Sequence, residues 1–192
     1  MFNPLRRFSR WFLAITPRQA FLLAGVSAWA LLCVVWLLRD WKDLSPCPLC
    51  IFQQVLYMVL GVLSLVFALP SFSVETWTGR RNYRVMGALL VLLCLGGMGV
   101  ALYQTLMQSM PGLVAECTFE DPGWIERFVE TLGAYWLDNG PVLPEFFLAI
   151  GLCSSKEWTL LGLSLANWSA VCFFGYGLFL TLTTRLFPRR EP

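Results

Sequence analysis

Residues 47–70 read CPLCIFQQVLYMVLGVLSLVFALP, a C-x-x-C cysteine pair followed directly by an apolar run without a charged residue. The run from Ile51 to Pro70 is long enough to cross a bilayer as a helix, which takes about 20 residues. A C-x-x-C pair exchanges electrons by forming and breaking one disulfide, at a rate set by the availability of the thiolate. This stretch therefore predicts a redox pair at the mouth of a membrane helix.

Three further runs are long enough to cross a bilayer. The predicted spans are residues 21–38, 51–70, 85–106 and 160–184, and none contains Asp, Glu, Lys or Arg. Of the 192 residues 57% are hydrophobic and only 14% charged, whereas a soluble domain carries about a quarter charged residues. The predicted fold is an all-α membrane protein, a four-helix bundle that forms one domain over residues 1–192. Spans without ionisable side chains argue against an ion pump or a proton channel.

The basic residues indicate the orientation of the spans. Ten of the fourteen lie in the N-terminal arm, in the loop between the second and third spans, or in the C-terminal tail. Cytoplasmic loops carry an excess of Lys and Arg, so both termini are predicted to be cytoplasmic. Loops 39–50 and 107–159 then face the periplasm. A net charge of +2 with no basic patch gives no indication of nucleic-acid binding.

The apolar run near the N-terminus is predicted to be a retained first helix. A cleaved signal peptide is the less favoured interpretation, because the run is longer than a usual signal-peptide core and lacks a small-residue cleavage site.

The seven cysteines divide by depth. Three lie inside apolar runs, where cysteine behaves as a small hydrophobe: Cys33, Cys94 and Cys172. Four lie in the predicted periplasmic loops: Cys47, Cys50, Cys117 and Cys153. An oxidising compartment lets disulfides form, and four cysteines allow three pairings among which the sequence does not choose. Two dithiols on one side of a bilayer indicate an electron relay.

Two other uses of the loop cysteines are less favoured. A structural zinc site usually takes two C-x-x-C knuckles, or one knuckle with paired histidines. This chain has one knuckle and no histidine, so no metal site is predicted. A disulfide within C-x-x-C closes too short a loop to stabilise the fold by much, which argues against a non-enzymatic membrane anchor with structural disulfides.

Cys50 directly precedes Ile51, where the second helix is expected to begin. The N–H groups and the dipole at a helix start favour an anion, so a thiolate is expected at Cys50, where it can meet a lipid-soluble electron acceptor.

The second periplasmic loop is predicted to contain a short helix. Its apolar residues recur at spacings of three and four: Trp124, Ile125, Phe128, Val129, Leu132, Tyr135 and Trp136. This spacing predicts a helix with one apolar face. The Trp and Tyr content is typical of a helix lying along the bilayer interface, and packing on top of the bundle is the alternative.

The chain resembles the DsbB family of bacterial inner-membrane proteins. The resemblance covers the four spans and both outer loops. It is most specific in residues 47–51, CPLCI, and in two stretches around the last loop cysteine: Pro144, Phe147, Ala149, Gly151 and Cys153, then Trp158, Leu161-Gly162-Leu163 and Trp168. Members of this family reoxidise the periplasmic thiol oxidase DsbA and pass the electrons to a membrane quinone, ubiquinone or menaquinone.

The resemblance implies a role for each loop cysteine. Cys117 and Cys153 would form the disulfide that oxidises the DsbA-like partner, with Cys117 in the mixed disulfide. Cys153 would then exchange with Cys47, and Cys50 would be released as a thiolate beside the quinone.

The chain departs from the family pattern around the quinone. Gln54 stands where the family normally has an arginine that contacts the quinone, and its amide is the expected replacement contact. Tyr103, Gln104 and Thr105 lie where some members carry a histidine. These departures keep open a specialised or accessory paralogue with a dedicated DsbA-like partner. Reverse electron flow, delivering reducing equivalents outward, is less favoured because the sequence shows no further dithiol to feed it.

Overall fold

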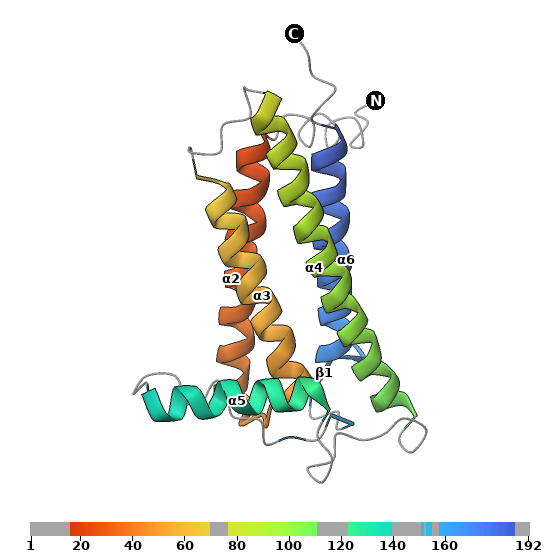
Figure 1. The fold of residues 1–192 in the computed structure, drawn as a ribbon. Helices are drawn as coiled ribbons and strands as arrows, with labels where there is room; N and C mark the ends of the chain where they lie inside the picture. Colours follow the sequence, from red (N-terminus) through yellow and green to blue (C-terminus); the bar gives the residue numbers. More distant parts are fainter. Residues whose placement is uncertain are drawn as a thin grey trace, which may run out of the picture.

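The computed structural model of the chain describes residues 16–69, 77–110, 123–139, 151, 153–154 and 158–186. Four long helices lie side by side: α2 (Pro17–Lys42), α3 (Pro48–Phe67), α4 (Trp77–Ser109) and α6 (Leu165–Leu186). A shorter helix, α5 (Trp124–Asn139), crosses one end of them (Figure 1). Within the described residues, these four long helices are apolar enough to span a membrane. The predicted all-α four-helix bundle is confirmed.

Local capping explains why α2 extends beyond the predicted span 21–38. Thr16 and Gln19 form a reciprocal capping box, in which the Thr16 Oγ1 accepts the Gln19 N–H at 3.3 Å and the Gln19 Oε1 accepts the Thr16 N–H at 2.9 Å. Such a box satisfies two helix-start donors. At the other end Asp43 adopts the left-handed conformation (φ 47°), and Lys42 lies in the last turn, where a cation favours the helix dipole.

The predicted starts of the second and fourth spans need correction. The helix α3 begins at Pro48 rather than Ile51, since proline is favoured in the first helical position. The fourth span was predicted from residue 160, but residues 159–164 form a hairpin before α6. Its strands are β1 (Thr159–Leu160) and β2 (Leu163–Ser164). Leu161 and Gly162 form the turn with φ values of 53° and 79°, as tight hairpin turns require.

The bundle consists of two closely packed pairs, α2 with α3 and α4 with α6, joined mainly along α3 and α4. Between α2 and α3, a Cβ at Gly25 would lie 2.7 Å from the Leu65 side chain; glycine allows this close approach. Between the pairs, the rings of Tyr57 and Phe173 stack with centroids 4.1 Å apart. Contact between α2 and α6 is sparser, and this is where the bundle is hollowed.

The predicted helix of the second loop is present as α5. Val129 is buried against Ile51 of α3. The ring of Phe52 makes edge-to-face contacts with the rings of Trp124 and Phe128, with centroids 5.7 and 5.9 Å apart. The apolar face of α5 therefore packs in part on the bundle, as the alternative prediction held. Trp124 nevertheless remains 70% exposed. Its placement along a bilayer interface stays a prediction.

Candidate active site

The start of α3 positions the C-x-x-C pair. Cys47 is the N-cap residue of this helix, and its Sγ accepts the N–H of Cys50 at 3.4 Å. Both cysteines are free thiols, and the Cys47 Sγ donates to the Cys50 Sγ at 3.1 Å. The prediction that the helix begins after Cys50 is therefore wrong by three residues. The cap position belongs to Cys47, and Cys50 lies in the first turn, where the helix dipole still acts.

Cys153 joins this pair from a segment one hundred residues away in the chain. It is buried in one cluster with Cys47, Leu49 and Met107. The thiol of Cys47 is hydrogen-bonded to Cys153 and to Cys50. The contact with Cys153 first, then the contact with Cys50 and burial, hold the pKa of Cys47 well above its ordinary value. The structure thus brings together three of the four predicted site cysteines.

A backbone contact docks the Cys153 segment on the loop before α3. The Gly151 N–H donates to the Pro46 carbonyl at 3.1 Å. A Cβ at Gly151 would collide with the carbonyl oxygen of Ser45, so a larger residue at this position must displace one of the two segments. Glycine is required here by the close approach of two backbones.

Three glutamines surround the cysteine pair. The Gln104 Nε2 of α4 lies 3.2 Å from the Cys47 Sγ and 3.0 Å from the Cys50 Sγ. The Gln53 Nε2 donates to the Gln104 Oε1 at 2.8 Å. Gln54, one residue further along α3, accepts a hydrogen bond from the Trp36 indole at 3.2 Å. All three glutamines are buried, so the polar groups nearest to the sulfurs are uncharged amides.

A cavity of about 300 Å³ opens beside the cysteine pair, between α2 and α6. Its walls are mainly apolar side chains of α2 together with the hairpin and α6, and its polar end is formed by the two cysteines and the glutamines. Ser169 of α6 also lines the cavity, and its buried Oγ has no hydrogen-bond partner among the residues that the structure describes. An apolar cavity with a few placed donors suits a flat lipophilic ligand that carries carbonyl groups.

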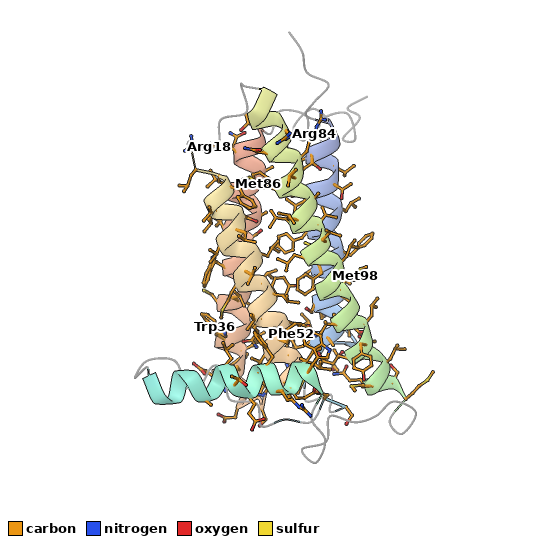
Figure 2. All side chains as sticks on the ribbon, in the orientation of Figure 1. Arg18, Trp36, Phe52, Arg84, Met86 and Met98 are labelled. Carbon is orange, nitrogen blue, oxygen red and sulfur yellow. The ribbon has the colours of Figure 1, made fainter. Side chains whose placement is uncertain are left out.

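The two ends of the bundle differ in charge. Figure 2 shows Arg18 and Arg84 at the end of the bundle away from α5, while Trp36 and Phe52 lie toward the cysteine end. The side chain of Arg18 donates to the Ala68 carbonyl at 3.0 Å at that far end. Arg18 and Arg84 thus lie at the far end from the C-x-x-C pair, whereas Arg39 and Lys42 in the last turn of α2 lie at the cysteine end, where Arg39 lines the cavity.

The predicted site residues are only partly covered by the structure. Cys117 lies outside the described residues. So do Pro144, Phe147 and Ala149, which precede Cys153 in the family resemblance. Gln54 lines the cavity with Cys50, as expected for residues one helical turn apart.

The sequence assigned no role to Gln53, Trp36 or Ser169, and it placed Gln104 only near the position where some family members carry a histidine. The structure places Gln104 and Gln53 beside the sulfurs, Ser169 in the cavity wall, and Trp36 in contact with Gln54. One signal for two of them was available: Gln53 and Gln104 are polar side chains inside apolar spans, which is a feature of functional sites in membrane proteins.

Comparison with known proteins agrees with this geometry. The family model for "Disulfide bond formation protein DsbB" matches residues 17–183. The chain is 42% identical over 178 residues to the disulfide bond formation protein B of Dechloromonas aromatica (strain RCB), covering 92% of this chain and 96% of the relative. It is 41% identical to that of Aromatoleum aromaticum over 67% of this chain and 69% of the relative. It is 38% identical to the disulfide bond formation protein B of Azoarcus sp. (strain BH72), over 81% of this chain and 85% of the relative.

The match spans all four long helices and the loops that carry the cysteines, so it covers the site as well as the fold. This chain belongs to the DsbB family, the inner-membrane oxidases that generate disulfide bonds.

Proposed function

We propose that this protein is a protein-thiol:quinone oxidoreductase. It oxidises the dithiol of a DsbA-like periplasmic partner and delivers two electrons and two protons to a membrane quinone. One observation carries the proposal: Cys47 and Cys50 lie at the polar end of an apolar cavity between membrane helices, and Cys153 is buried in one cluster with Cys47.

The exchange begins at the disulfide between Cys117 and Cys153. A thiolate of the partner attacks Cys117 and forms a mixed disulfide, which releases the Cys153 thiolate. The second thiol of the partner then displaces Cys117, and the partner leaves with a new disulfide. Two electrons have moved from the partner to the Cys117–Cys153 pair.

The second exchange passes these electrons to the helix mouth. Cys153 attacks the Cys47 sulfur of the Cys47–Cys50 disulfide, and Cys50 is the leaving group. Cys117 then displaces Cys47 from Cys153, which restores the Cys117–Cys153 disulfide and leaves Cys47 and Cys50 reduced. The hydrogen bond between the Cys47 and Cys153 thiols supports this order, because exchange requires direct contact of the two sulfurs.

Residues of the cavity would hold the quinone. Its chemistry is to accept two electrons and two protons and to become a quinol. The buried Ser169 hydroxyl is a suitable donor to one ring carbonyl, and the amide of Gln54 is the candidate donor to another. The apolar side chains of α2 exclude water, which keeps the Cys50 sulfur from side reactions.

The cysteine end of the bundle faces the periplasm in this proposal, and the end with Arg18 and Arg84 faces the cytoplasm. Ten of the fourteen basic residues lie in the N-terminal arm, between the second and third spans, or in the C-terminal tail, and such an excess is typical of the cytoplasmic side, which supports this orientation.

The test is anaerobic turnover by the purified full-length protein with a reduced DsbA-like protein, comparing ubiquinone with menaquinone. Cys50→Ser is expected to abolish quinone reduction. Cys94→Ser, a change of the same kind in the middle of the bundle, should retain most of it. A Cys50→Ser protein that reduces quinone at the normal rate would refute the mechanism. Running the assay with several DsbA-like proteins also tests whether one dedicated partner is preferred.

A further inference from the structure

One amide nitrogen serves both sulfurs of the C-x-x-C pair. The Gln104 Nε2 lies 3.2 Å from the Cys47 Sγ and 3.0 Å from the Cys50 Sγ. An amide NH₂ has two donor hydrogens, so a single group can donate to both sulfurs at once. Gln104 is only 2% exposed, and water therefore has little access to replace these bonds.

A second glutamine fixes the orientation of this amide. The Gln53 Nε2 donates to the Gln104 Oε1 at 2.8 Å, and Gln53 is 5% exposed. With its carbonyl end held by α3, the Gln104 amide presents its nitrogen to the sulfurs. The donors are therefore in place before any charge develops, which is the condition for effective electrostatic stabilisation.

These donors act differently on the two redox states of the pair. Hydrogen bonds to an ionised acceptor are about twice as strong as those between neutral groups. A thiolate carries a charge and a disulfide sulfur does not, so the amide stabilises the reduced pair more than the oxidised one. A pair whose reduced form is stabilised is a stronger oxidant.

We propose that Gln104 tunes the Cys47–Cys50 pair by raising its reduction potential, and that Gln53 is the positioning residue that holds Gln104 in place. The purpose of this tuning rests on the proposed function. Two electrons from the Cys117 and Cys153 thiols break the Cys47–Cys50 disulfide while the Cys117–Cys153 disulfide forms, and quinone is the final oxidant. A higher potential at the receiving pair drives this transfer toward the cavity.

The experiment measures that potential in full-length protein freed of quinone. Wild type and variants are equilibrated in dithiothreitol or glutathione redox buffers and quenched with an alkylating reagent. Peptide mass spectrometry then reports the Cys47–Cys50 disulfide separately from the other cysteines. In Gln104→Leu the equilibrium constant for reduction is expected to fall about tenfold, which is a midpoint about 30 mV more negative.

Two further variants separate tuning from a loss of packing. Gln53→Leu leaves every donor to sulfur in place but releases the Gln104 carbonyl, so it should shift the midpoint in the same direction by less. It also provides the measurement should Gln104→Leu fail to fold. Gln54→Leu is the matched control: it makes the same change in the same cavity, but the hydrogen bond of Gln54 is to Trp36, and the midpoint should not move.

An unchanged or more positive midpoint in both Gln104→Leu and Gln53→Leu would overturn the inference, as would an equal shift in Gln54→Leu. The measurement needs neither partner nor quinone. A wild-type protein that fails to reduce quinone would therefore refute the proposed function while leaving the midpoint comparison intact.

Discussion

Cys47 and Cys94 are buried to nearly the same extent but lie in different surroundings. Cys47 is 3% exposed and Cys94 is 1% exposed. In the middle of the bundle, Cys94 belongs to the core cluster with Leu90 and Phe173. At the end of the bundle, Cys47 contacts the amide of Gln104 and the thiols of Cys50 and Cys153.

Burial alone therefore does not distinguish the proposed reactive cysteine, Cys47, from Cys94 in the apolar core. The polar groups around each sulfur make the difference, because amide donors and neighbouring thiols set how readily a sulfur carries charge and which sulfur it can reach. Changes at the cysteine end should alter thiol exchange, while matched changes in the middle of the bundle should alter stability.

The largest effect is expected from Gly151→Ala. A Cβ at this position meets the Ser45 carbonyl oxygen, so the Cys153 segment must move away from the loop before α3. A displacement of about 1 Å at a reacting centre can cost on the order of 100-fold in rate. We expect partner-dependent quinone reduction to fall between about tenfold and 100-fold, measured at saturating quinone.

Gly97→Ala is the counterpart in the middle of the bundle. A Cβ there would meet the Phe173 ring, and overpacking of a core costs about 1–3 kcal/mol. This variant should lower the unfolding temperature while the turnover of the folded protein stays near normal. Equal losses of turnover in the two variants would mean that the distinction between the two regions is wrong.

Most of the helical architecture follows from the sequence, because an uncharged run of about 20 residues has few other stable environments. The sequence did not predict the hairpin at residues 159–164, because Leu160, Leu161 and Leu163 have the hydropathy of a membrane helix. Only the backbone conformation of the turn, with positive φ at Leu161 and Gly162, distinguishes this segment from the start of the helix. The start of α3 was misplaced because Cys47 acts as the N-cap, a role usually filled by Ser, Thr, Asp or Asn.

The site was predictable in part. The C-x-x-C spacing predicted Cys47 and Cys50 as a redox pair, and the predicted topology put Cys153 in a loop on the same side, which agrees with the cluster that the structure shows. The contact of Gln104 with both sulfurs was not predictable, because it depends on the rotation of α4 relative to α3, which hydropathy does not determine. Gln53 and Gln54 are adjacent in sequence, yet one supports Gln104 and the other contacts Trp36.

The next largest effect is expected in the pH dependence of alkylation at the Cys47 thiol. Its pKa is raised well above the ordinary value of 9.0, first by the hydrogen bond to Cys153. Alkylation requires the thiolate, so the rate at Cys47 in the reduced protein should be low at pH 7–8. It should still rise about tenfold per pH unit through pH 9, whereas an ordinary thiol levels off there.

Linkage gives the sign of the matching stability effect. The folded pKa of Cys47 exceeds its unfolded value, so its contribution to stability is complete below about pH 9 and is lost as pH rises toward the folded pKa. The unfolding temperature of the reduced protein should therefore decline above about pH 9, and less steeply in Cys47→Ala. A Cys47 alkylation rate that levels off below pH 9 would contradict both expectations.

The smallest effect on activity is expected from a change at Gln54, which lines the cavity beside Cys50. Gln54→Arg supplies a charged donor to a quinone carbonyl, and such a bond is about twice as strong as a neutral one. The replacement also removes the acceptor of the Trp36 indole N–H, which lies 3.2 Å from the Gln54 Oε1, and this loss offsets part of the gain. We expect the apparent KM for quinone to fall about two- to fivefold.

The double variant Trp36→Phe with Gln54→Arg separates the two contributions, because phenylalanine has no N–H that needs an acceptor. Quinone affinity should then exceed that of Gln54→Arg alone, with Trp36→Phe alone as the control. If arginine weakens binding in both backgrounds, the cavity, which Arg39 already lines, is shaped around the amide of Gln54. The neutral glutamines beside the sulfurs would then be a coordinated feature of this chain, in which the quinone contact and the cysteine contacts rely on the same uncharged chemistry.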